Sequence, residues 1–194
     1  MRKRVCVPMI ALCLLLSGCG AEQEEKDLRE PYRSMIGCTM EAVVSCDQEG
    51  YVWEAALRCD YVPDGESSLE ILEPETLAGV RAVVSDADWR LEYEELCLDM
   101  GTISREEISP VMCLPRLMDA LREGWLLEEN EENWVETPCL RLTVDQTGEN
   151  KGKILSTLWL RLEDGLPVRG EISVEDEIIL TAEFTNFTFC DIIN

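Results

Sequence analysis

Turn signals recur at short intervals between residues 38 and 189 and divide this part of the chain into short β-prone runs. Pro63-Asp64-Gly65 and Glu163-Asp164-Gly165 are two clear examples, because Pro, Asp and Gly adopt turn conformations readily. Short connections favour consecutive antiparallel hairpins, since parallel strands need long crossovers. The runs that predict strands are 38–46, 51–62, 67–72, 80–84, 89–93, 96–100, 139–144, 154–162, 166–174 and 178–189.

A sheet of about ten strands either curls or closes. The predicted fold class is therefore α+β, with an incomplete, open antiparallel β-barrel of about ten strands and helices over its concave face. The clearest helix begins near Pro115 and ends before Gly124. Its apolar residues fall on one stripe, which must cover something apolar. They are Leu114, Leu117, Met118 and Leu121.

Three irregular segments are also predicted. Residues 73–79 are expected to form one or two helical turns, with proline near the start and glycine past the end. Residues 128–133, with the sequence EENEEN, are expected to form an acidic loop or hairpin. The spacing of the three phenylalanines in 184–189 departs from strict alternation, which predicts a β-bulge near Asn186.

The N-terminus has the pattern of a secretion signal. Three basic residues at 2–4 precede the apolar run 5–16, which is too short to span a bilayer as a helix. The run ends in Leu-Ser-Gly-Cys at residues 16–19, which resembles a bacterial lipobox. The resemblance implies a diacylglyceryl group on the Cys19 thiol and cleavage before Cys19. The alternative is an ordinary secretory signal with a chance cysteine.

This pattern predicts three parts of the chain: a lipoprotein signal peptide at 1–18, a lipidated cysteine and flexible tether at 19–34, and the folded domain at 35–194. Two acyl chains give stable anchoring where a single chain gives only marginal binding. We therefore expect the protein to be lipid-anchored on the extracytoplasmic face of a cell membrane.

The charge and composition exclude several classes of function. The chain carries a formal net charge of −23, so nucleic acid is not an expected partner, because phosphate binding needs a basic face. The chain has no histidine, which removes the Ser-His-Asp and Cys-His catalytic systems. Its cysteines contain no C-x-x-C pair, which argues against zinc-ribbon and thioredoxin-type motifs. Acidic groups such as Asp86, Asp88 and 128–132 lack EF-hand spacing and are interpreted as solvated loops. The sequence thus predicts no catalytic residue, no metal site and no cofactor.

Three short motifs resemble those of LolA-like lipoproteins, which are relatives of the outer-membrane lipoprotein carrier. They are ILEP at 71–74 followed by LAG at 77–79, GLPVRGEI at 165–172, and FTNFTF at 184–189. The resemblance covers roughly residues 35–190 and extends to the group of spore germination lipoproteins that includes GerS. It implies a LolA/LolB-like open barrel with a helical lid and a hydrophobic cavity. In the carriers the cavity holds acyl chains, whereas in the germination group the fold is a scaffold for a cell-wall amidase. A carrier that shuttles is soluble, whereas a protein lipidated at Cys19 cannot shuttle.

A cavity of this kind would be lined by apolar residues of the sheet and of the helical stripe. The candidates are Trp53, Leu57, Leu114, Leu117, Met118, Leu158, Leu160 and Phe184. The alternative is that they form only a packed core, because residue types do not distinguish the two. The expected function is non-enzymatic: binding of an apolar ligand such as an acyl chain, or scaffolding of a cell-envelope enzyme in sporulation or germination. The alternative function is that of a lipoprotein acceptor or trafficking factor.

Overall fold

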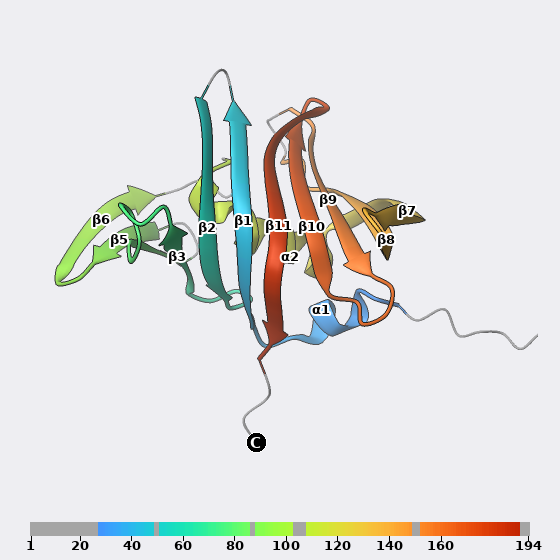
Figure 1. Ribbon diagram of the computed structural model, residues 1–194, viewed down its shortest axis with the longest axis horizontal. Coiled ribbons are helices and arrows are strands. Elements are labelled where there is room, and N and C mark those ends of the chain that lie inside the picture. Colours follow the sequence, from blue (N-terminus) through green and yellow to red (C-terminus); the bar gives the residue numbers. More distant parts are fainter. Residues whose placement is uncertain (1–26, 49–50, 86–87, 103–107, 149–151, 191–194) are drawn as a thin grey trace, which may run out of the picture.

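The computed structural model describes residues 27–48, 51–85, 88–102, 108–148 and 152–190. These residues form a single antiparallel sheet of eleven strands with one main helix packed behind it (Figure 1). The strands are β1 (Cys38–Gln48), β2 (Tyr51–Tyr61), β3 (Ser67–Glu73), β4 (Arg81–Ser85), β5 (Asp88–Tyr93), β6 (Leu96–Thr102), β7 (Trp125–Trp134), β8 (Thr137–Asp145), β9 (Ile154–Arg161), β10 (Pro167–Val174) and β11 (Glu177–Phe189). The helices are α1 (Glu30–Ser34), η1 (Pro110–Met112) and α2 (Cys113–Glu123).

The strand order is β6-β5-β4-β3-β2-β1-β11-β10-β9-β8-β7. Neighbouring strands of the sheet are consecutive in the chain except at the centre, where the first strand pairs with the last, from Cys38 opposite Phe189 to Cys46 opposite Leu180. The edge strands β6 and β7 do not pair with each other, so the sheet stays open. The predicted fold class is therefore confirmed: the fold is α+β and its open antiparallel sheet carries a helix on its concave face.

The core lies between α2 and the concave face of the sheet. The predicted apolar stripe of α2 is confirmed, because its four side chains are at most 1% exposed. Gly170 of β10 allows α2 to approach the sheet closely, because a Cβ at that position would lie only 2.6 Å from Leu117 Cδ1. A glycine in the middle of a strand often marks such a close approach.

Three local predictions have different outcomes. Of the loop or hairpin predicted for the acidic residues 128–133, the loop is wrong and the hairpin is confirmed, because these residues lie within β7 and pair with the following strand β8. The segment 73–79 forms successive turns closed by backbone bonds such as Leu77 N to Pro74 O at 2.9 Å, and not a helix. The bulge next to Asn186 is confirmed: Glu41 pairs with Asn186 while Ala42 pairs with Phe184.

The segment that precedes β1 packs onto the domain. Leu28 and Tyr32 are buried, and the Tyr32 hydroxyl donates to the carbonyl of Gly165 at 2.7 Å. The segment 28–34, which precedes the expected start of the folded domain at residue 35, therefore packs with that domain through Leu28 and Tyr32. The flexible tether was expected at 19–34, but Leu28 and Tyr32 bury apolar side chains against the domain and so dock the C-terminal end of that segment.

Arg29 joins this segment to the C-terminal end of α2. Its Nε donates to the carbonyl of Leu121, and its Nη2 donates to the carbonyls of Ala120 and Gly124, each at 3.0 Å. The last carbonyls of a helix have no partner within the helix, and a cationic side chain there also complements the helix dipole. Arg29 is only 6% exposed.

Within the described ranges, no helix is both long and apolar enough to cross a membrane.

Candidate ligand cavity

A cavity of about 400 Å³ opens on the concave side of the sheet, next to β2, β3 and β4. Its volume falls within the range of small-molecule sites, roughly 300–1,000 Å³. Its walls come from three strands, from the turn after β3 and from η1. The lining residues are Trp53, Glu54, Ala55, Leu57, Leu69, Ile71, Pro74, Leu77, Val80, Ala82, Pro110 and Val111.

Strand alternation explains why this wall is apolar. Successive side chains of a strand point to opposite faces of the sheet. On β2, Ala55 and Leu57 are buried on the concave face, while Arg58 on the other face pairs with Glu41. Leu57 pairs with Ile71 of β3, so the apolar row continues from one strand to the next.

The cavity carries almost no charge. Glu54 is the one charged residue in its lining, and this carboxylate accepts a hydrogen bond from the Ser45 hydroxyl at 3.1 Å. A buried polar group of a ligand would find few partners on the remaining walls, and leaving it without one is costly. The chemistry of the lining therefore suits an apolar, uncharged ligand or a hydrocarbon chain.

The predicted cavity residues occupy two places. Trp53 and Leu57 line the cavity. Phe184 is half-buried and packs against the core. The other five lie in the core between α2 and the sheet, each at most 1% exposed, and none is among the residues that line this cavity: Leu114, Leu117, Met118, Leu158 and Leu160.

Several lining residues escaped the sequence reasoning. Pro74 and Leu77 lie in the turn after β3, and Pro110 and Val111 lie in η1. No periodic pattern predicts where side chains of turns and short helices point. The one available signal was the apolar character of residues 108–112 just before α2.

The described lining of this cavity includes neither the lipidation residue nor the acidic residues considered in the sequence. Cys19 and Asp86 lie outside the described residues. In the described part of the chain, no group of three or more Cys, Asp or Glu side chains is arranged to hold a metal ion. Asp88 begins β5, and the acidic cluster 128–132 belongs to β7.

The cysteines of the described residues are mostly buried apolar side chains. Burial raises the pKa of Cys38 and of Cys113 to about 12 and also raises that of Cys59. Thiols with a raised pKa stay protonated at pH 8, and the thiolate is the reactive form. The thiols that the structure describes are all free; Cys97 and Cys190 are exposed, and Cys38, Cys46, Cys59, Cys113 and Cys139 are buried.

We therefore expect iodoacetamide at pH 8 to modify Cys97 and Cys190 of folded residues 20–194 within minutes. The buried five should react only after unfolding in denaturant. Peptide mapping by mass spectrometry measures both sets. Modification of Cys59 at the rate of Cys97 in the folded protein would contradict this packing.

No protein-family model matches the chain, and no curated protein matches it. Several solved structures resemble the chain at low sequence identity. A putative outer membrane lipoprotein-sorting protein domain from Vibrio parahaemolyticus is 10% identical with a TM-score of 0.49, covering 86% of this chain and 91% of that one. A LolA superfamily protein from Nitrosomonas europaea is 10% identical with a TM-score of 0.46, covering 85% and 91%. LprF from Mycobacterium bovis is 14% identical with a TM-score of 0.47, covering 87% and 92%. These are likenesses of fold, and neither ligand nor activity is carried over from them.

Proposed function

We propose that this protein is a non-enzymatic lipoprotein, anchored through Cys19 on the extracytoplasmic face of a membrane, whose domain binds an apolar ligand in the cavity beside β2–β4. The observation that carries the proposal is the apolar cavity of about 400 Å³. Pockets that bind small apolar ligands are concave and lined in this way. The missing histidine supports the non-enzymatic part, because the commonest general base is unavailable.

The end of the signal pattern at Leu-Ser-Gly-Cys supports the anchor. The net charge of −23 supports a domain held away from an anionic bilayer surface, since like charges repel within a Debye length of roughly 8 Å. The alternative is a lipoprotein acceptor, in which the ligand is the acyl chain of another lipoprotein. The same cavity would serve both.

The test of ligand binding is native mass spectrometry of residues 20–194, purified without detergent. A bound mass in the lipid range supports the proposal. The proposal would be overturned if the protein shows only its own mass and also fails to bind the neutral probe N-phenyl-1-naphthylamine.

Leu77→Asp is expected to weaken binding of that probe at least tenfold, because it places a carboxylate on an apolar wall. Leu77 is 49% exposed, so the substitution should leave the fold intact. Val52→Asp is the matched control: Val52 is 71% exposed, lies on β2 and is not part of the cavity lining. Probe fluorescence and thermal unfolding are measured for both. Equal affinities for the two variants would place the ligand outside this cavity.

A further inference from the structure

The hairpin formed by β5 and β6 has one apolar face, which is exposed along β6 and half-buried at Leu91 of β5. Leu91 pairs with Leu98, and Tyr93 pairs with Leu96, so these side chains lie on the same face as Met100. Leu96 is 66% exposed and Leu98 is 59% exposed. Soluble proteins rarely expose contiguous apolar surface of this kind, and larger patches mark interaction sites.

This face continues the wall of the cavity but extends beyond it. Leu91 pairs with Ala82 of β4, and Ala82 pairs with Leu69 of β3. Ala82 and Leu69 line the cavity, whereas Leu91 and Leu98 do not. In Figure 1 the hairpin projects sideways from the central strands, away from α2. The hairpin is thus a separate surface next to the cavity.

The same hairpin also presents an open sheet edge. β6 is the last strand on its side of the sheet, and each of its seven residues is exposed. In an antiparallel pair only alternate residues bond to the neighbouring strand, so the others direct N–H and C=O groups outward. An exposed apolar edge strand is a template for pairing with another chain.

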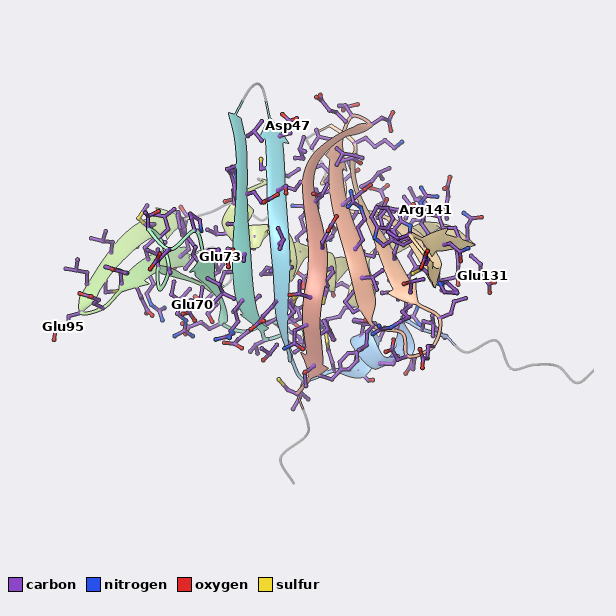
Figure 2. The ribbon with its side chains drawn as sticks, viewed as in Figure 1. Asp47, Glu70, Glu73, Glu95, Glu131 and Arg141 are labelled. Atoms are coloured by element: carbon purple, nitrogen blue, oxygen red, sulfur yellow. The ribbon has the colours of Figure 1, made fainter. Side chains whose placement is uncertain are left out.

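The opposite edge of the sheet is built differently. β7 carries four glutamates within residues 128–132, all of them exposed. Charged side chains on an edge strand discourage pairing with a further strand. Figure 2 shows Glu95 at the tip of the β5–β6 hairpin and Glu131 on the opposite side of the molecule. One edge is protected by charge, whereas the other keeps an apolar row at alternate positions.

The charges around β6 indicate the kind of segment that fits it. Residues 88–102 contain five acidic residues and a single arginine. That arginine, Arg90, is already engaged by Glu66 at 2.9 Å and by Glu92 at 2.8 Å. A second copy of this chain would bring its own β6, with Asp99 and the glutamates of the tip, against like charges. Complementarity therefore favours a basic segment.

We propose that β6 binds an extended segment of a partner protein by strand addition, and that this segment carries apolar residues at alternate positions and Lys or Arg at its ends. Main-chain bonds along the edge supply affinity. The apolar side chains of the added strand extend the row of Leu96, Leu98 and Met100. The basic ends meet the acidic residues of the hairpin. This surface does not depend on the cavity's holding a ligand.

The test uses the full chain in nanodiscs of phosphatidylcholine and a fluorescein-labelled peptide, Lys-Arg-Val-Thr-Val-Thr-Val-Arg-Lys. We expect saturable binding by fluorescence anisotropy. Leu98→Lys should weaken it at least tenfold, because it places a cation on the apolar row and repels the peptide. Val52→Lys introduces the same side chain at an exposed position of β2 and should leave the affinity unchanged. A peptide with proline in place of each valine cannot pair as a strand and should bind at least tenfold more weakly.

Four results would overturn the proposal. One is the absence of peptide binding to the unmodified chain, and another is equal binding to the Leu98→Lys protein. If the proline peptide binds with the same affinity as the valine peptide, charge attracts the peptide and no strand pairing occurs. A dimer in analytical ultracentrifugation that Leu98→Lys converts to a monomer would mean that a second copy occupies the edge. Thermal unfolding of each variant is measured alongside the titrations. If Leu98→Lys alone lowers the stability of the fold, Leu96→Lys takes its place in the binding test.

Discussion

Replacing Arg29 with alanine is expected to lower the free energy of unfolding by about 2–4 kcal/mol. The substitution removes a buried side chain whose guanidinium serves three carbonyls, those of Ala120, Leu121 and Gly124. The Ala120 carbonyl would keep the hydrogen bond from the Gly124 N–H at 3.1 Å, whereas those of Leu121 and Gly124 would lose the donor that Arg29 supplies. A buried acceptor without a hydrogen bond is costly. The same change also frees the docked segment that holds Leu28 and Tyr32.

Urea unfolding followed by circular dichroism measures this effect in residues 20–194. Arg33→Ala is the matched control, because the Arg33 side chain is 42% exposed and its ion-pair partners among the described residues are the exposed acids Asp27 and Glu30. Exposed pairs contribute about 0–1 kcal/mol. Arg29→Lys keeps the positive charge but loses the planar guanidinium that donates to several carbonyls at once. The free energy of unfolding of this variant should therefore lie between those of Arg29→Ala and Arg33→Ala. Equal losses for Arg29→Ala and Arg33→Ala would contradict the capping role.

Cys19→Ala is expected to move the protein from the membrane fraction to the soluble fraction of the cell. The proposed anchor consists of acyl chains whose burial contributes about 0.8 kcal/mol per CH₂, so losing them removes nearly all membrane affinity. The net charge of −23 also opposes association of the domain with an anionic bilayer. Fractionation with immunoblotting measures the distribution.

The comparison variant is Cys97→Ala, which removes an exposed thiol of the folded domain and should stay with the membrane. Cys19→Ala changes none of the buried residues from Leu28 onward, so it should also leave thermal unfolding and probe binding unchanged. Persistent membrane association of Cys19→Ala would mean that another element anchors the chain, and the lipid anchor would then be rejected.

The parts of the fold that follow a regular period were predictable. The stripe of α2 and the hairpins around Pro63-Asp64-Gly65 and Glu163-Asp164-Gly165 were found because periods and turn residues are local signals. For the same reason Trp53 and Leu57 were identified as candidates on the face that lines the cavity.

The features that were missed depend on distant partners. β7 is acidic on both faces and gains its strand conformation from pairing with β8, which its own composition does not reveal. Arg29 stands in a charged segment that suggests solvent exposure, yet the carbonyls it serves lie 91–95 residues away. Pro110 and Val111 of η1 share the cavity lining with residues of β2–β4 that lie far away in the sequence, a placement set by packing.

The pairing of β1 with β11 at the centre of the sheet has a consequence for the order in which the chain folds. Every other neighbouring pair joins consecutive strands, whereas Glu41 and Thr185 meet across 144 residues. Closing such a loop costs about 2 kcal/mol more entropy than closing one of ten residues. The hairpins of β1–β6 and of β7–β11 should therefore form early, as two half-sheets. Their union is the slow step, because non-local contacts limit folding rates. α2 contacts β2 on one side and β8, β9 and β10 on the other, so it bridges both half-sheets once they have met.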